Sequence, residues 1–300
     1  MNVLSLFDGI SCGRVALERA GIEVNNYYAS EIDKTAIKIS QANHDDIIQL
    51  GDINHLQSRS LPDIDLLIGG SPCQNFSRGA TISNKERTGL KGDRSNLFWK
   101  YLEAKNRFNP TYFLLENVVM PKEHEEIISM VLGVEPIKIN SDLVSFQNRE
   151  RLYWTNIPGV TIPEDKNISF QDYKDTDFNY CSLFKVNPTP SRLKMWGDGV
   201  SGNCPNVTNR DKVNCITLKQ DRHKNSGLVA FDGFCRYLTR RELELAQTLP
   251  VGYTDCVSYN QACKAIGNGW TVDVIAHILK SMNEIKYIPT QIDWIEEARA

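Results

Sequence analysis

Short apolar runs alternate with helix-like segments over the first 157 residues, and this alternation constrains the fold more than any other feature. It is typical of an α/β protein in which helices cover both faces of a parallel sheet. We expect strands at residues 2–7, 26–30, 46–50, 65–69, 111–115, 135–139 and 151–155. We expect helices near residues 12–20, 34–42, 95–108, 122–132, 239–248 and 271–282.

The alternation stops in the second half of the chain, where prolines, glycines and asparagines separate the apolar residues. This composition predicts that residues 158–235 form a small, loop-rich domain inserted into the main one. The main domain would comprise residues 1–157, and residues 236–300 would pack back on it.

The formal charge of the chain is −3, but the charges are unevenly distributed along it. Residues 185–241 carry eleven Lys and Arg against four Asp, a net charge of +7, so the remainder carries −10. Such a segment is either an ordinary solvated surface or, because it is also rich in Asn, Gly and Ser, a loop-rich surface that contacts a polyanion.

Two further features of the composition exclude other classes of protein. No apolar run approaches the roughly 18 residues of a membrane span, and no basic segment precedes the apolar residues at the N-terminus. We therefore expect a cytoplasmic protein. The eight cysteines form no C-x-x-C pair and have no matching histidine spacing, so we expect neither a metal site nor a disulfide framework.

Polar or glycine-rich segments follow five of the expected strands, at the ends that a parallel sheet brings to one edge. They are residues 7–13, Glu31 with Asp33, residues 51–53, Pro72 with Cys73, and Glu116 with Asn117. Each alone is also compatible with a common turn or a helix cap. Glycine allows close approach of a ligand to the backbone, and an acid after the second strand commonly holds a ribose. Together the five segments predict a cleft for a nucleoside cofactor.

Cys73 is the most reactive group expected at this cleft. A free cysteine is most often a small buried hydrophobe. Beyond the carboxyl end of a central strand, however, its thiol would face the ligand cleft of a parallel sheet. We interpret Cys73 as a candidate nucleophile because other functional residue types follow the neighbouring strands.

Seven motifs in order give the chain a resemblance to the DNA cytosine-C5 methyltransferases, which use S-adenosylmethionine. They stand at residues 7–13 (FDGISCG), 31 (E), 51–53 (GDI), 70–74 (GSPCQ), 116–118 (ENV), 147–151 (QNRER) and 267–270 (GNGW). The resemblance covers most of the chain and implies a Rossmann-like methyltransferase sheet with residues 158–235 as the target-recognition domain. Residues 236–243 and 267–272 are most similar to the eukaryotic de novo branch, whereas residues 72–74 are similar to bacterial modification enzymes. We expect a prokaryotic or phage enzyme.

The resemblance implies methyl transfer to C5 of a cytosine in double-stranded DNA, which yields 5-methylcytosine. C5 is a weak nucleophile until C6 is attacked, and that attack would be the role of the Cys73 thiolate. Glu116 would hold N3 and the exocyclic amine of the base. Gln147, Arg149 and Arg151 are spaced by two and would share one face of a strand, with the arginines orienting the base and Cys73. The target cytosine would be flipped out of the duplex, because its ring atoms are otherwise inaccessible.

The resemblance also implies a cofactor site built from both ends of the chain. Phe7 and Ile32 would stack on the adenine of S-adenosylmethionine, Glu31 would bind the ribose hydroxyls and Asp52 the adenine amine. Ile32 departs from the bulkier aromatic often found at that position. Trp270 would close the pocket or would equally serve as a core aromatic. The complete expected set is Phe7, Asp8, Gly9, Ile10, Gly13, Glu31, Ile32, Asp52, Ile53, Pro72, Asn268 and Trp270.

DNA contacts are expected from the polar loop 77–94, which would close over the site, and from the basic segment 185–241. The expected contact residues are Ser77, Arg78, Lys85, Arg87, Arg94, Arg240 and Arg241. A cognate restriction system is a possible partner. Two alternatives stay open: a tRNA cytosine-C5 methyltransferase, and a catalytically silent DNA-binding relative. The joint presence of Cys73, Glu116, Arg149 and Arg151 argues against the silent relative.

Overall fold

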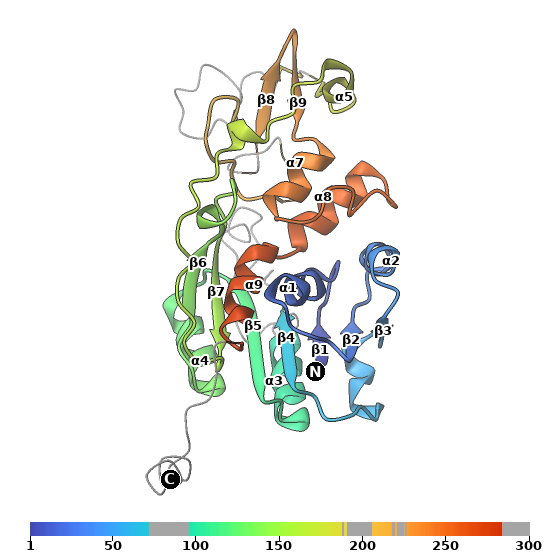
Figure 1. The fold of residues 1–300 in the computed structure, drawn as a ribbon, viewed down its shortest axis with the longest axis vertical. Coiled ribbons are helices and arrows are strands. Elements are labelled where there is room, and N and C mark those ends of the chain that lie inside the picture. Colours follow the sequence, from blue (N-terminus) through green and yellow to red (C-terminus); the bar gives the residue numbers. More distant parts are fainter. Residues whose placement is uncertain are drawn as a thin grey trace, which may run out of the picture.

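A seven-stranded sheet forms the centre of the molecule in the computed structural model, which describes residues 1–71, 96–187, 189–190, 206–217, 220, 225 and 227–283 (Figure 1). The strands are β1 (Asn2–Leu6), β2 (Asn26–Ser30), β3 (Ile47–Gln49), β4 (Leu66–Gly70), β5 (Tyr112–Val118), β6 (Ile137–Asn140) and β7 (Glu150–Thr155). Their order is β3-β2-β1-β4-β5-β7-β6. All seven expected strands are therefore present, with ends that differ by up to three residues.

The expectation of a parallel sheet is confirmed for β1 to β5 and is wrong for β7. That strand runs antiparallel to both of its neighbours, β5 and β6. Only residues 141–149 connect β6 to β7. A connection this short suits an antiparallel pair, because a parallel pair requires a crossover of a dozen or more residues.

Helices cover both faces of the sheet. The α-helices are α1 (Cys12–Ala20), α2 (Lys34–Asn43), α3 (Asn96–Phe108), α4 (Lys122–Leu132), α5 (Phe178–Ser182), α7 (Arg240–Ala246), α8 (Tyr259–Asn268) and α9 (Val272–Lys280), and the 3₁₀ helices are η1 (Ile53–Ser58), η4 (Ser141–Leu143) and η5 (Phe170–Asp172). Successive residues of β1 alternate between the two cores: Val3 packs in the core that contains α1 and α9, whereas Leu4 and Leu6 pack in the core that contains α3 and α4. The contact of α9 with α1 packs the C-terminal region against the first part of the chain.

Besides α5 and the 3₁₀ helices, two elements of the structure were not expected from the sequence. One is the hairpin β8 (Leu228–Phe231) and β9 (Phe234–Tyr237), which lies with α5 at the far end of the molecule from the N-terminus (Figure 1). The other is α8, whose first turn is closed by a capping box between Ser258 and Gln261. The boundary expected at residue 235 falls inside β9, so the hairpin continues directly into the C-terminal region.

A buried ion pair joins the hairpin to α7. Arg236 on β9 donates from Nη2 to Glu242 Oε1 at 2.7 Å and from Nη1 to Oε2 at 2.8 Å, and both side chains are 0% exposed. The backbone carbonyls of Asp175 and Tyr237 accept further bonds from the same guanidinium.

Across the described part of the chain, no helix has the length and apolarity that crossing a membrane would require.

Candidate active site

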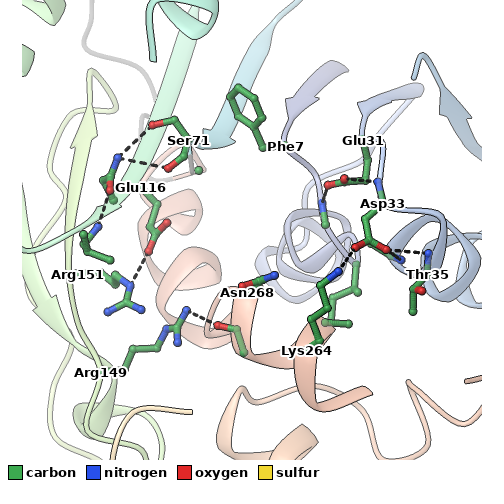
Figure 2. A pocket seen from close by; sticks show the side chains of 18 of the residues that line it. Phe7, Glu31, Asp33, Thr35, Ser71, Glu116, Arg149, Arg151, Lys264 and Asn268 are labelled. Carbon is green, nitrogen blue, oxygen red and sulfur yellow. Dashed lines mark hydrogen bonds and ion pairs between the residues drawn. The ribbon is translucent and has the colours of Figure 1, made fainter. Parts of the chain in front are cut away.

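A cavity of about 290 Å³ lies beyond the carboxyl ends of the parallel strands, where the sequence predicted a cleft. Strands β1, β2, β4 and β5 supply one part of its wall, and helix α8 supplies another (Figure 2). Three of the five polar strand ends therefore meet at one place, together with Gly70 and Ser71 at the end of β4. The described residues that line it are Phe7, Gly9, Ile10, Glu31, Asp33, Thr35, Ala36, Gly70, Ser71, Glu116, Asn117, Val118, Arg149, Arg151, Gln261, Lys264, Ala265, Gly267 and Asn268.

The turn after β1 presents backbone to the cavity. Gly9 has a φ of +59°, a left-handed conformation that costs glycine little, and Phe7 and Ser11 share that conformation. Beneath the turn, the Asp8 carboxylate accepts hydrogen bonds from the Tyr27 hydroxyl at 2.7 Å and the Ser11 hydroxyl at 2.5 Å. Burial of this carboxylate raises the pKa of Asp8 to about 6. Asp8, an expected cofactor contact, thus supports the turn from below and does not line the cavity.

Glu31 is fixed by backbone donors at the end of β2. Its Oε2 accepts from Gly9 N at 2.8 Å, and its Oε1 accepts from Ile32 N at 2.7 Å and Asp33 N at 2.8 Å. Three N–H groups therefore hold the carboxylate in one orientation, and the residue lines the cavity together with Phe7. An oriented carboxylate beside an aromatic ring suits a ribose and its base.

Glu116 and two arginines form the opposite wall of the cavity (Figure 2). Arg151 Nε lies 2.9 Å from Glu116 Oε1, and the Trp270 indole donates to Glu116 Oε2 at 3.1 Å. Arg149 donates to the carbonyls of Gly269 at 2.9 Å and Gly267 at 3.3 Å. Its guanidinium therefore connects this wall to the end of α8.

Comparison with known proteins agrees with this architecture. Residues 1–132 match the family described as C-5 cytosine-specific DNA methylase. This part of the chain is therefore similar to that family. The Dnmt2 methyltransferase of S. pombe, whose crystal structure is known, shares the fold of this chain with a TM-score of 0.73 at 20% identity, over 96% of this chain and 100% of that one.

Sequence relatives of this chain are named as bacterial and phage methyltransferases. The type II methyltransferase M.NgoBI of Neisseria gonorrhoeae is 29% identical over 305 residues, which cover 91% of this chain and 90% of that protein. The orphan methyltransferase M.Rho11sI of Bacillus phage rho11s is 34% identical over 179 residues, which cover 55% of this chain. The chain spans only 35% of the length of M.Rho11sI and 37% of that of M.SPRI from Bacillus phage SPR.

A cysteine that the sequence did not single out lies beside the two arginines of the cavity. The Sγ atom of Cys215 accepts from Arg149 Nη1 at 3.4 Å and is 3.9 Å from Arg151 Nη2. Burial disfavours its thiolate, but the two guanidinium groups outweigh burial and lower the pKa of Cys215 below its usual value. Cys215 thereby connects residues 206–217 to the arginines of the cavity.

An ion pair between α8 and the start of α2 lies at the edge of the cavity (Figure 2). Lys264 Nζ lies 2.6 Å from Asp33 Oδ2, and this hydrogen bond lowers the pKa of Asp33. The sequence prediction assigned no role to Lys264 or Gln261. The sequence contained a pattern that could have indicated them: Gln261, Lys264 and Asn268 are spaced by three and four, so they share one face of a helix.

Several expected cofactor residues lie away from the cavity. Asp52 caps η1 by accepting from Asn54 N at 2.9 Å, and Ile53 is buried in the core beside α3. Ile32 is 70% exposed. Gly13 is buried in α1, where an added Cβ would lie 2.4 Å from Ile68 Cδ1. These positions support the strand ends or the surface next to them.

Gln147 does not line the cavity beside Arg149 and Arg151, because its amide bonds within the protein. Its side chain is fully buried, accepts from Ile216 N at 2.9 Å and donates to Ala246 O at 3.0 Å. Gln147 therefore joins the backbone at Ile216 to the end of α7.

The guanidinium groups of Arg240 and Arg241, both expected DNA contacts, bond within the protein. Arg241 Nη1 lies 2.8 Å from Asp175 Oδ1. Arg240 donates to the carbonyls of Thr254 and Val257. These bonds favour a structural role for both side chains.

Other expected residues lie outside the part of the chain that the structure describes. They are Pro72, Cys73, Ser77, Arg78, Lys85, Arg87 and Arg94. Within the described ranges, no group of three or more His, Cys, Asp or Glu side chains could hold a metal ion.

Proposed function

We propose that this chain transfers a methyl group from S-adenosylmethionine to C5 of a flipped-out cytosine in double-stranded DNA. One observation carries the proposal: a single cavity joins the Glu31 and Phe7 end, suited to a nucleoside, to the Glu116 and Arg151 end, suited to a polar base. The match of residues 1–132 to the C-5 cytosine-specific DNA methylase family and the relatives named as type II and orphan methyltransferases support the same reaction.

The residues of the cavity fit the cofactor by their chemistry. Glu31 would accept from the ribose hydroxyls, because its carboxylate is already oriented by three backbone N–H groups. Phe7 would stack on the adenine, and Ile10 and Asn268 would contact the remainder of the molecule. When bound, the cofactor supplies an electrophilic methyl group.

The protein side chains would supply the remaining chemistry. The Cys73 thiolate would add to C6 of the cytosine, and the added electron density would make C5 nucleophilic. After methylation, C5 would lose its proton and the bond between sulfur and C6 would break, which restores the thiolate and the aromatic ring. Glu116 would hold N3 and the exocyclic amine, with Arg151 fixing its carboxylate.

The reaction can be tested with labelled S-adenosylmethionine and two acceptors, duplex DNA and tRNA. We expect label in DNA, a loss of at least a hundredfold in Cys73→Ser, and near-normal transfer in Cys256→Ser. Cys256 is a matched control because it does not line the cavity. Full activity of Cys73→Ser would exclude the covalent mechanism, and transfer to tRNA alone would replace DNA as the substrate.

Whether the methylase acts with a restriction nuclease is a separate part of the proposal. M.NgoBI is named as a type II methyltransferase and M.Rho11sI as an orphan one, so the relatives include both kinds. Base-resolved sequencing of 5-methylcytosine in DNA from cells that express the chain would define its recognition sequence. A cognate nuclease would then be expected to cut that sequence only when it is unmethylated.

A further inference from the structure

Trp270 makes a contact that its expected role as a cofactor residue does not explain. It does not line the cavity, and its indole N–H donates to Glu116 Oε2 at 3.1 Å across 154 residues of sequence. We propose that Trp270 is a positioning residue that orients the Glu116 carboxylate toward the target base. The proposal rests on the function proposed for Glu116 above.

The space between β4 and β5 is shaped for this contact. Gly70 ends β4, and a Cβ atom added there would lie 2.8 Å from Trp270 Nε1 and 3.0 Å from Glu116 Oε2. Any larger residue at position 70 would therefore push the indole and the carboxylate apart. The absence of a side chain at Gly70 allows the two groups to meet.

The backbone on both sides of Trp270 is held in place. The carbonyl of Gly269 accepts from Arg149 at 2.9 Å. The hydroxyl of Thr271 donates to Gln247 Oε1 at 2.7 Å and accepts from the Ser141 hydroxyl at 2.8 Å, both in the buried interior. The indole N–H is therefore presented to Glu116 from a fixed position.

Two donors of different charge then fix the two oxygens of one carboxylate. Arg151 holds Oε1 and neutralises the charge, whereas Trp270 holds Oε2 and adds no charge. With one donor the carboxylate could still rotate about its last bond, but with two its plane is set. The remaining lone pairs keep a constant direction in the cavity, where N3 and the exocyclic amine of a base would bind.

Trp270→Phe tests the proposal because it removes the N–H and keeps an aromatic ring. We expect kcat for methyl transfer to fall about tenfold to a hundredfold, the range for one hydrogen bond to a charged group. The KM values for DNA and for the cofactor should change by no more than about twofold, because phosphate contacts dominate DNA affinity. Trp154→Phe is the matched control: the buried Trp154 indole donates to Ser129 Oγ at 3.0 Å, away from the cavity.

A second readout does not depend on activity. In ¹H–¹⁵N spectra, Glu116→Gln should move the indole resonance of Trp270 and leave that of Trp154 in place. Gly70→Ala should also move the Trp270 resonance, which provides a second variant if Trp270→Phe does not fold. An unmoved Trp270 resonance would overturn the proposal, as would a kcat loss in Trp270→Phe no larger than that in Trp154→Phe. If the wild-type chain methylated no DNA, the function proposed above would fail, whereas the spectra would still test the contact.

Discussion

Two Arg–Glu pairs in this protein have the same chemistry but different surroundings. Arg236 and Glu242 are both 0% exposed, form two parallel hydrogen bonds and join the hairpin to α7. Arg151 and Glu116 are 14% and 11% exposed, approach to 2.9 Å between Nε and Oε1, and line the cavity. The first pair is enclosed within the fold, whereas the second faces a space that a ligand can enter. The comparison therefore contrasts an ion pair that joins two elements of the fold with one that lines a cavity.

Two further carboxylates extend this comparison. Asp8 is enclosed without a cation and is held by the hydroxyls of Tyr27 and Ser11. Asp33 pairs with Lys264 at the exposed edge of the cavity. The four carboxylates are Glu242, Asp8, Glu116 and Asp33. The size of the change in unfolding free energy on removal of each charge should decrease in that order.

The largest effect on stability is expected for Glu242→Gln. The variant leaves the buried guanidinium of Arg236 without a counter-charge, which costs about 3–5 kcal/mol of unfolding free energy. Urea denaturation followed by circular dichroism measures this loss. The double variant Arg236→Met/Glu242→Leu should recover most of it, and failure of the double variant to recover would show that packing, not charge, is responsible.

Asp8 should make the stability of the protein depend on pH. Because the pKa of Asp8 is raised to about 6, the folded state binds a proton more tightly than the unfolded state. Its contribution to stability is therefore complete below about pH 4 and is lost as the pH rises through about 6, by about 2–3 kcal/mol. In Asp8→Asn this part of the pH dependence should vanish.

The control for Asp8 is Asp232→Asn, which changes an exposed carboxylate at the turn of the hairpin. That variant should keep the wild-type pH dependence between about pH 4 and pH 6. If Asp8→Asn kept it as well, the titrating group would have to be another carboxylate.

Glu116→Gln should separate stability from activity. The change should alter the unfolding free energy by only about 1 kcal/mol, since the partly exposed Arg151 can be hydrated in the variant. Methyl transfer should fall by about a hundredfold to ten-thousandfold, the usual contribution of a positioned acid or base. A large loss of stability in this variant would place the Arg151 pair with the structural pair of Arg236.

Lys264→Met should have the smallest effect on folding. Its pair with Asp33 is exposed, so the unfolding free energy should change by about 0.2–1 kcal/mol, and the difference should shrink at high salt. Thermal unfolding at two salt concentrations tests this expectation. A salt-independent loss would indicate that Lys264 contributes through packing.

The sequence was most informative about features that depend on neighbouring residues, such as the ends of strands. Apolar runs followed by polar residues correctly placed the strand ends of Phe7, Glu31 and Glu116 at one cavity. Helix α8 was missed although Ser258 and Gln261 have the spacing of a capping box, because its buried residues include small ones such as Ala262 and Ala265.

Partners distant in sequence could not be predicted. Arg241 looks like a surface charge until Asp175, 66 residues away, is found beside it. The bond between Trp270 and Glu116 spans 154 residues, and the antiparallel direction of β7 depends on how its connection folds. These contacts are products of tertiary structure, for which a single sequence carries no periodic signal.

The most direct test of the proposed active site is nucleoside mass spectrometry of duplex DNA incubated with S-adenosylmethionine and either the wild-type chain or Glu116→Gln. We predict 5-methylcytosine with the wild-type chain and at least a hundredfold less with the variant at equal folded concentration. Equal amounts of 5-methylcytosine from both proteins, or a methyl group on any other atom of the DNA, would contradict the role assigned to this cavity.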